Sequence, residues 1–432
     1  MKGILLTKIA IIGSGYVGLS LGVCLAGAGY SVHLCDKNPE RIETLKKGIP
    51  PFREPFLAQM LTASHLNFTT SLEEAVNQAD ICFLCLPTPT LSNGACDLSQ
   101  IESLLDRLPP EIPIVIKSTV IPGTARRIAN LLPTNQIISN PEFLQVGKAI
   151  ENTLNPDRII LGYDDYETAL KIQALYVDLS IDPGKILLMD FESAEMSKYA
   201  ANVMLASRLA TLGEIAKLCD KTGANIEDVK RSIALDPRIG QEYLETGIGY
   251  GGPCLSKDLR AIAFLENSPL LNEINQSNES MIAHFMQKIF SYFNTEDLSK
   301  KTFAVWGVTF KKDAEDTRES PALKIVKQLL AKGATIRIYE PMCTLFIDEI
   351  TQFESATECL QTADALCLLT PHTSLPLNEI QNVPVVFDGR NLLLKQPTNM
   401  LPFDYFAVGG PNAQNRCKTE DRRETLFPST SE

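Results

Sequence analysis

The sequence predicts an α/β protein in which two parallel-sheet domains flank a helical domain. Short apolar strands alternate with amphipathic stretches up to about Asp190, and the same alternation returns near Thr302. The region between them has a helical pattern, and 432 residues exceed what one ordinary core contains. We therefore expect domains at 1–190, 191–298 and 299–410, followed by a polar, disordered tail at 411–432.

The first parallel-sheet domain opens with a strand, a helix and a second strand, predicted at 8–12, 16–29 and 31–35. Later apolar runs are short enough to be strands that are buried on both faces. They are predicted at 80–86, 112–118 and 136–139. Because strands and helices alternate along this part of the chain, we expect the whole sheet to be parallel.

A long helix is predicted at the start of the middle region. Residues 191–219 contain no proline and only Gly213 as glycine, and their apolar positions recur at helical spacing. This helix would connect two domains and offer a face for a dimer. A second helix is predicted at 270–293, and strands follow at 302–307, 335–339, 365–369 and 384–387.

Composition excludes several classes of function. The formal net charge is −12 and no long basic run precedes the tail, which argues against a nucleic-acid partner. No window holds the roughly 20 continuous apolar residues of a membrane-spanning helix, and no cleavable signal pattern is present. Eleven cysteines without disulfide-scaffold density favour a reducing compartment, so we expect a cytoplasmic protein. Four dispersed histidines predict no metal site.

A dinucleotide-binding motif follows the first predicted strand. Gly13 permits a tight turn, Gly15 lets the backbone approach a pyrophosphate, and Gly18 lets the next helix pack closely on the strand. Tyr16 and Val17 lie within the motif, where the N-terminus of the helix faces the phosphates. A strand, this motif and a helix in that order predict a Rossmann domain.

An acidic residue selects between the two nicotinamide cofactors. Asp36 ends the second predicted strand, about twenty residues after the motif, where a carboxylate binds ribose hydroxyls and repels a 2′-phosphate. The sequence therefore predicts NAD in preference to NADP, although Lys37 and Arg41 lie nearby.

Cys254 ends the glycine-rich run Gly249-Tyr250-Gly251-Gly252-Pro253-Cys254, with Lys257 and Asp258 just behind it. Glycines allow close backbone approach, and cations favour a reactive thiolate. Since a thiol can add to an aldehyde and present a second hydride, an NAD domain with this cysteine predicts an oxidation that continues past the aldehyde. A structural cysteine in a glycine turn is the alternative. Cys82 and Cys85 lie in an apolar run, which predicts a buried strand and no redox pair.

Polar residues follow two buried strands of the first domain, at Thr88 and at Lys117-Ser118-Thr119. Such loops bind ligands in parallel sheets, but ordinary turn chemistry explains these residues equally well. Lys198 and Asn202 are four residues apart and share one face of the long helix. That spacing alone favours a solvated stripe.

Ordered motifs from about residue 8 to residue 391 resemble those of the UDP-glucose/GDP-mannose dehydrogenase family. They are GSGYVGLSLG from Gly13, KSTV from Lys117, NPEFL from Asn140, NPDRIILG from Asn155, KYAAN from Lys198, DPRIG from Asp236, GYGGPCLSKD from Gly249, TFKKDAEDTRESPAL from Thr309 and FDGRN from Phe387. The resemblance implies that the terminal alcohol of a nucleotide sugar is oxidised to a carboxylate with two NAD and one water. It also implies a Rossmann NAD-binding domain, a central helical domain with a long connecting helix, and a C-terminal Rossmann-like domain for UDP.

The resemblance also implies catalytic roles. Cys254 would attack the aldehyde from the first oxidation, and the resulting thiohemiacetal would become a thioester that water hydrolyses. Lys198 and Asn202 would stabilise the oxyanion, and Asp258 would help Lys198 to activate the water. Two further positions would serve the same water network, namely Thr119 and Glu142.

Binding residues follow from the same motifs. Besides the glycine motif, the implied NAD contacts are Asp36, Arg41, Thr88, Thr119, Lys257 and Arg318. The implied nucleotide-sugar contacts are Glu142, Phe143, Leu144, Lys198, Asn202, Gly249, Tyr250, Gly251, Lys311 and Arg390. Arg238 would reach the substrate of a neighbouring subunit, which implies at least a homodimer.

UDP-glucose is the expected substrate, and UDP-glucuronate the expected product. Relatives that use acetylated sugars tend to carry histidine before the cysteine, where Pro253 stands here. GDP-mannose and UDP-N-acetylhexosamines are the alternative substrates, while a simple hydroxy-acid dehydrogenase would not need Cys254. Val146 replaces a usual glutamate, so a nucleotide-sugar-binding protein without turnover is a further alternative.

Overall fold

The computed structural model describes residues 7–62, 66–266, 268–380, 382–394 and 401–411. Contacts divide the chain into two compact units, Met1–Ala201 with Arg260–Glu266 and Asn202–Leu259 with Asn267–Glu432. Helices α9 (Phe191–Thr222) and α11 (Leu255–Glu266) contribute residues to both units. The three predicted domain boundaries stay a prediction, and the predicted tail beyond Pro411 lies outside the described residues.

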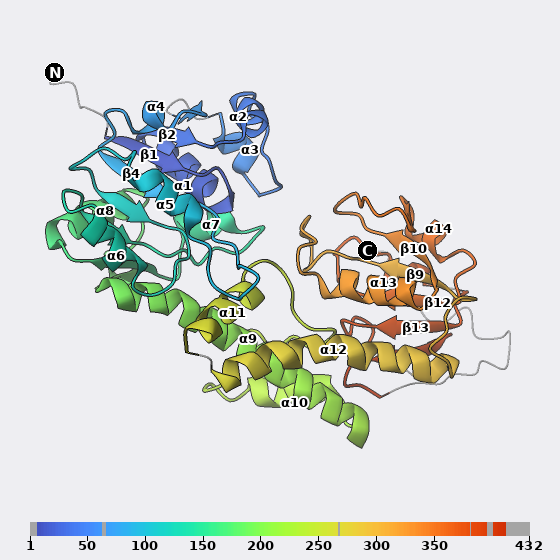
Figure 1. The fold of residues 1–432 in the computed structure, drawn as a ribbon. Helices are drawn as coiled ribbons and strands as arrows, with labels where there is room; N and C mark the ends of the chain where they lie inside the picture. The colour runs from blue at the N-terminus through green and yellow to red at the C-terminus, as the bar shows by residue number, and fades with distance from the viewer. Residues whose placement is uncertain (1–6, 63–65, 267, 381, 395–400, 412–432) are drawn as a thin grey trace, which may run out of the picture. The chain divides into compact units, whose positions relative to one another are not determined.

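The first unit is built on an eight-stranded sheet in the order β3-β2-β1-β4-β5-β6-β7-β8 (Figure 1). Its strands are β1 (Lys8–Ile12), β2 (Ser31–Cys35), β3 (Leu66–Thr69), β4 (Ile81–Leu84), β5 (Ile114–Ile116), β6 (Ile137–Ser139), β7 (Ile159–Tyr163) and β8 (Ile186–Met189). Its helices before α9 are α1 (Tyr16–Gly27), α2 (Pro39–Lys46), α3 (Leu57–Met60), α4 (Leu72–Val76), α5 (Ser99–Leu105), α6 (Thr124–Leu131), α7 (Ala149–Leu154) and α8 (Tyr166–Asp178), with a short 3₁₀ turn η1 (Pro183–Lys185). The strand order reverses at β1, between β2 and β4, and such a switch point is where open α/β sheets bind ligands.

Strand β1 has apolar neighbours on both faces of the sheet. Ile9 and Ile11 belong to one buried cluster, together with Leu19 of α1. Ala10 and Ile12 belong to a second cluster. Because successive side chains of a strand point to opposite faces, an uninterrupted apolar run is what such a central strand requires. Helices therefore cover this sheet on both sides.

The prediction of a fully parallel sheet is wrong at one edge. β7 runs antiparallel to β6, and β8 then runs parallel to β7. An antiparallel neighbour needs no full crossover, and the segment between β6 and β7 contains only the six-residue helix α7. The predicted strands at 8–12 and 31–35 are confirmed, whereas β4, β5 and β6 are shorter than predicted.

The second unit combines helices with a six-stranded parallel sheet in the order β11-β10-β9-β12-β13-β14. Its strands are β9 (Thr302–Trp306), β10 (Thr335–Tyr339), β11 (Ile350–Phe353), β12 (Ala365–Leu368), β13 (Val385–Asp388) and β14 (Asp404–Ala407). Its other elements are α10 (Ile226–Ala234), α12 (Pro269–Phe293), α13 (Pro321–Ala331), α14 (Ala356–Leu360) and the 3₁₀ turn η2 (Leu377–Glu379). The predicted long helices are confirmed as α9 and α12.

One apolar cluster joins the central helices to this sheet. Leu212 of α9 and Ile289 of α12 belong to it together with the buried strands β9, β12 and β13. Phe285 of α12 and Phe387 of β13 meet edge to face, with ring centroids 6.4 Å apart, and α12 runs beside β13 in Figure 1. No helix of the described residues is long and apolar enough to cross a membrane.

Candidate functional site

The turn after β1 leaves an open cradle at the N-terminus of α1. Gly13 has φ +106°, and a Cβ on it would lie 2.4 Å from the carbonyl oxygen of Cys85, so only glycine fits. A Cβ on Gly15 would meet nothing within 4 Å, and Gly15 caps α1 without a side-chain hydrogen bond. There is therefore space beside Gly15 at the N-terminus of α1, which suits a pyrophosphate. Tyr16 and Val17 form the first turn of this helix.

Asp36 lies directly after β2, next to this cradle. Its Oδ2 accepts hydrogen bonds from the Ser14 N–H (2.9 Å) and the Ser14 hydroxyl (2.6 Å), while Arg41 lies 3.5 Å away. Burial raises the pKa of Asp36, but the Ser14 and Asn38 hydrogen bonds and the Arg41 charge outweigh burial and lower it. The side chain stays 12% exposed. An ionised carboxylate in this position fits the ribose hydroxyls of NAD.

The predicted loops after β4 and β5 lie against each other. The Thr88 hydroxyl donates to the carbonyl oxygen of Thr119 (2.6 Å), and the Ser118 hydroxyl accepts the Leu86 N–H (2.8 Å). Both loops therefore stand at the carboxyl ends of neighbouring strands. Ser118 and Ser14 were not predicted as site residues, because a hydroxyl beside a strand end has no distinctive spacing.

Glu142 and Lys198 form a nearly buried ion pair in the first unit. Lys198 Nζ lies 3.1 Å from Glu142 Oε1, and the other carboxylate oxygen accepts the Leu144 N–H at 2.6 Å. Burial raises the pKa of Glu142, but Lys198 and the Leu144 amide outweigh burial and hold it below its usual value. Lys198 also lies over the Phe143 ring, 5.4 Å from its centroid. The solvated stripe that spacing favoured is wrong for Lys198, which is 5% exposed.

Lys117 is a second buried lysine of the first unit. Lys117 Nζ donates to Asn140 (3.1 Å) and to the Tyr176 hydroxyl (3.2 Å), and Asn140 donates to the Ile160 carbonyl. Lys117 and Asn140 begin two of the recognised motifs, but only the fold brings them together. Their bonds fix the strand ends that present Thr119 and Glu142.

Glu195, one turn before Lys198 on α9, holds the start of α6. Its carboxylate accepts the Gly123 N–H (2.6 Å) and the Ala125 N–H (2.7 Å). Burial raises the pKa of Glu195 to about 7, although these amides act in the opposite direction. A sequence pattern could have suggested it, since Glu195 and Lys198 are three residues apart on one helix.

The raised pKa of Glu195 predicts a pH-dependent stability. The folded protein holds this proton more tightly than the unfolded chain, so its contribution is fully present below about pH 4.5 and is lost as pH rises through about 7. Glutamine does not titrate. As pH rises across this range, the unfolding free energy of the wild type should therefore fall relative to that of Glu195→Gln by on the order of 1–3 kcal/mol. Denaturant unfolding at several pH values measures it. Glu167→Gln, an exposed change on α8, is the control; equal pH slopes in all three proteins would refute the assignment.

Cys254 stands at the N-terminal end of α11, in the second unit. It is the exposed one of the ten cysteines that the described residues contain. Cys82 and Cys85 are buried, as predicted, and burial raises the pKa of Cys85 to about 12. The amide of Asp258 donates to the Cys254 carbonyl (2.9 Å), which begins the helix. A helix N-terminus favours a thiolate, so position and exposure both suit a nucleophile.

Asp258 accepts hydrogen bonds from two other predicted site residues. Asn202 Nδ2 donates to one carboxylate oxygen (2.5 Å), and Lys257 Nζ donates to the other (2.6 Å). Asp258 is 1% exposed and Asn202 is 6% exposed. The carboxylate is thus held by two donors, one turn of helix from Cys254. A solvated position is therefore wrong for Asn202 as well.

The glycine-rich loop before Cys254 is held by side chains that form hydrogen bonds with its backbone. Asn278 of α12 accepts the Tyr250 N–H (2.8 Å) and donates to the Tyr250 carbonyl (3.0 Å). Arg390, after β13, donates to the Gly249 carbonyl (2.8 Å). Burial lowers the pKa of Arg390 to about 10, so it remains charged at neutral pH. Asn278 was missed, because it lies in the polar run Asn275-Gln276-Ser277-Asn278-Glu279-Ser280, where one more amide is not distinctive.

The other predicted contacts are distributed around the second unit. A Cβ on Gly251 would lie 2.3 Å from the Glu319 carbonyl, so the loop that carries Lys311 and Arg318 packs against the glycines. Arg318 pairs with Asp316 (2.6 Å). Arg238 is 88% exposed and pairs with Asp236 (2.6 Å). The first unit therefore gathers the residues around Asp36 and Glu142, and the second unit gathers those around Cys254.

Comparisons with known proteins identify the family of the chain. Three descriptions of the UDP-glucose/GDP-mannose dehydrogenase family match in order: the NAD binding domain over residues 7–180, the central domain over 192–280 and the UDP binding domain over 304–395. The chain is 33% identical to the UDP-glucose 6-dehydrogenase of Rickettsia bellii, over 93% of this chain and 99% of that protein. It is 34% identical to a UDP-glucose 6-dehydrogenase of Bacillus subtilis, over 93% of this chain and 97% of that protein.

Solved structures agree with the sequence relatives. A UDP-glucose dehydrogenase from Pyrobaculum islandicum superimposes with a TM-score of 0.86 at 28% identity, covering 95% of this chain and 99% of that one. A UDP-D-ManNAc dehydrogenase from Pyrococcus horikoshii gives a TM-score of 0.82 at 26% identity, covering 93% and 99%. The chain therefore belongs to the UDP-glucose/GDP-mannose dehydrogenase family, whose members are NAD-dependent nucleotide-sugar dehydrogenases, and it carries the family's NAD-binding and UDP-binding domains.

Proposed function

We propose that this protein is a UDP-glucose 6-dehydrogenase, which oxidises UDP-glucose to UDP-glucuronate with two NAD and one water. The observation that carries the proposal is Cys254, an exposed thiol at a helix N-terminus, one helical turn from the buried Asp258. A dehydrogenase that stopped at an aldehyde or ketone would need no such thiol. Relatives at 33% and 34% identity that are named UDP-glucose 6-dehydrogenases support the choice of sugar.

The residues of the first unit prepare the alcohol oxidation. Bound NAD supplies the hydride acceptor for both oxidations. Asp36 and Arg41 hold the cofactor's ribose side, while Thr88 and Thr119 order the loops at the strand ends. Lys198 presents an ammonium that donates to the sugar's reacting oxygen and stabilises its negative charge. Glu142, ionised beside Lys198, accepts a proton through water when the alcohol is oxidised.

The residues of the second unit carry the aldehyde to the acid. The Cys254 sulfur forms a bond to the aldehyde carbon and gives a thiohemiacetal, whose oxidation leaves a thioester. Asn202 donates to the oxyanion, and Asp258, held by Asn202 and Lys257, takes a proton from the water that hydrolyses the thioester. The carboxylate leaves and the thiol regains its proton. Because the aldehyde stays bonded, it does not escape between the two oxidations.

Other residues position the nucleotide sugar. The substrate contacts that we infer from the family motifs are the backbone from Glu142 to Leu144 in the first unit and the Gly249–Gly251 segment in the second. Lys311 and Arg390 supply cations for the diphosphate. Arg238 is exposed and, in a homodimer, is available to the partner's substrate. Val146 provides no carboxylate beside Glu142, so this chain's water network depends on Glu142 and Asp258.

The experiment is a substrate panel with reduced cofactor followed by absorbance. UDP-glucose, UDP-galactose, UDP-N-acetylglucosamine and GDP-mannose are compared at equal concentration. We expect UDP-glucose to give the highest kcat/KM and to yield two NADH per sugar consumed. An acetylated UDP-sugar is the second candidate, since the Pyrococcus horikoshii structure is a UDP-D-ManNAc dehydrogenase. One NADH per sugar would reject the thioester route, and binding without any NADH would point to a protein that does not turn over.

A further inference from the structure

The second unit repeats the nucleotide-binding frame of the first. β9 and β10 are paired side by side, as β1 and β2 are. Gly307 follows β9 with φ +79° and donates to the last carbonyl of β10 (3.0 Å); Gly13 follows β1 with φ +106° and donates to the last carbonyl of β2 (2.7 Å). Glu340 then stands directly after β10, in the place that Asp36 has after β2.

Glu340 differs from Asp36 because protein donors already occupy its carboxylate oxygens. It accepts three backbone N–H groups, from Val308 (2.7 Å), Thr309 (3.2 Å) and Met342 (2.8 Å). The side chain of Glu340 is 0% exposed, whereas that of Asp36 is 12% exposed. A carboxylate without exposed surface and with its lone pairs already used cannot take a ribose hydroxyl. Glu340 therefore has a different role from Asp36.

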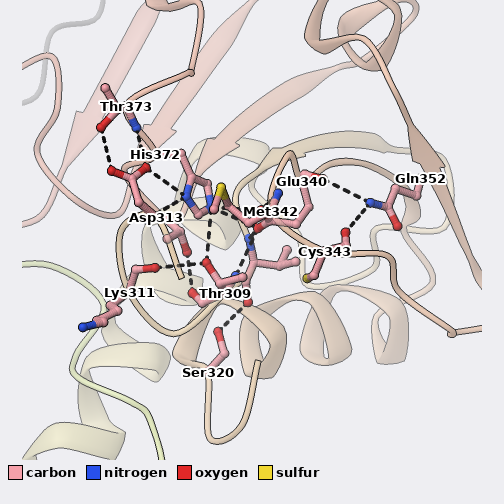
Figure 2. Close-up of polar contacts among 12 residues, drawn as sticks. Thr309, Lys311, Asp313, Ser320, Glu340, Met342, Cys343, Gln352, His372 and Thr373 are labelled. Carbon is pink, nitrogen blue, oxygen red and sulfur yellow. Dashed lines mark hydrogen bonds and ion pairs between the residues drawn. The ribbon is translucent and has the colours of Figure 1, made fainter. Parts of the chain in front are cut away.

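His372, which follows β12, is a further partner of the Glu340 carboxylate (Figure 2). Its Nε2 lies 3.1 Å from the Glu340 carboxylate and 3.2 Å from the Thr309 hydroxyl. Its Nδ1 accepts the Asp313 N–H (3.0 Å), so the hydrogen-bond network assigns the ring proton to Nε2, which donates toward Glu340. The imidazole is 0% exposed. We call Glu340 and His372 the clamp.

The clamp holds one end of the loop 308–320, which carries Lys311. Val308, Thr309 and Asp313 are bonded to the clamp directly. Asp313 also accepts the Thr373 N–H (2.9 Å) and the Thr373 hydroxyl (2.6 Å). The loop is therefore tied to the residues after both β10 and β12, as Figure 2 shows.

The other side of the same loop supports the cysteine loop. The Gly252 N–H donates to the Arg318 carbonyl (3.2 Å), and a Cβ on Gly252 would lie 2.6 Å from the Phe310 ring. Gly252 is two residues before Cys254, so a displacement of the 308–320 loop is transmitted to the thiol. One loop thus connects the clamp, Lys311 and the nucleophile.

We propose that His372 is a positioning residue for the reaction: through Glu340 and Asp313 it fixes the loop 308–320, which binds the substrate's nucleotide diphosphate and supports the Cys254 loop. The proposal rests on the proposed function, because it gives Lys311 and Cys254 their tasks. His372 touches no reacting atom.

Three substitutions separate the two hydrogen bonds of the imidazole. His372→Gln keeps a donor at the distance of Nε2, His372→Asn keeps an acceptor at the distance of Nδ1, and His372→Leu keeps neither. His284→Leu is the matched control, because it removes a partly buried histidine that is paired with Asp220 (2.6 Å) elsewhere in the same unit. For each protein, UDP affinity is measured by calorimetry, Cys254 alkylation by peptide mapping, and kcat and KM with UDP-glucose and NAD.

We expect His372→Leu to weaken UDP binding roughly 10-fold, the effect of losing one hydrogen bond to a charged group. It should also change the Cys254 alkylation rate and lower kcat, with KM for NAD unchanged. His372→Gln should recover most of the UDP affinity, because it keeps the bond to Glu340, and His284→Leu should lower only the melting temperature. UDP affinity unchanged in all His372 variants, or weakened equally by His284→Leu, overturns the proposal. UDP titration decides this even if the wild type does not oxidise UDP-glucose, and the Gln and Asn variants decide it if His372→Leu does not fold.

Discussion

Cys254→Ser is expected to stop the reaction before the carboxylate forms. A serine hydroxyl at this position is a far weaker nucleophile than a thiolate. We expect the rate of UDP-glucuronate formation to fall at least about 10³-fold, with the aldehyde held on the enzyme as the last species formed. Single-turnover NADH release and mass spectrometry of the sugar products measure this. The wild type should release two NADH per site and the variant at most one.

Alkylation of the wild type tests the exposure of the Cys254 thiol. Alkylation with iodoacetamide, followed by peptide mapping, should label Cys254 ahead of buried cysteines such as Cys24, whose pKa burial raises to about 12. UDP-glucose should protect Cys254, and labelling there should inactivate the wild type. Cys96→Ser, a change at a half-buried cysteine, is the matched control and should keep full activity. Normal carboxylate production by Cys254→Ser would reject the thioester route.

The sequence predicted the bounds of those strands whose own residues show a clear pattern. β1, β2 and β10 have the predicted bounds: β1 is an apolar run that ends at Gly13, whereas β2 and β10 alternate apolar with polar residues. β3, β11 and β14 were not predicted, since their runs are short and their buried faces exist only once neighbouring strands pair with them. β7 and β8 were not predicted either, and the antiparallel direction of β7 depends on the path of the connection, which local pattern does not encode.

The predicted site residues depended on the family motifs, and spacing alone gave a different answer. Lys198 and Asn202 are hydrophilic residues on one helical face, yet Glu142 and Asp258, which are distant in sequence, bury and pair them. Asn278 and His372 lie outside the motifs and act through backbone atoms of other segments. Such contacts leave no spacing in the sequence. Only the folded chain brings their partners together.

Lys198→Met is expected to lower both activity and stability, because Lys198 is the partner of a buried charge. The Glu142 carboxylate lies 3.1 Å from the ammonium, and the two side chains are 12% and 7% exposed. Removing one partner of such a pair costs about 3–5 kcal/mol of unfolding free energy, and removing an oxyanion donor lowers kcat by about 10²–10³-fold. Methionine preserves the apolar stem of Lys198 and removes the ammonium group, which lies 5.4 Å from the Phe143 ring centroid, so the loss reports the charge and its donors.

The pH dependence and a double variant distinguish these two effects. Since Lys198 holds the pKa of Glu142 below its usual value, their pairing stabilises the fold above about pH 4.5 and is lost as pH falls through the folded-state pKa. The stability difference between wild type and Lys198→Met should therefore shrink in acid. Lys198→Met with Glu142→Gln should recover most of the stability at pH 7 without recovering kcat, because the buried charge is gone but the oxyanion donor and the proton acceptor are both missing. A double variant that regains activity would contradict the proposed roles of both Lys198 and Glu142.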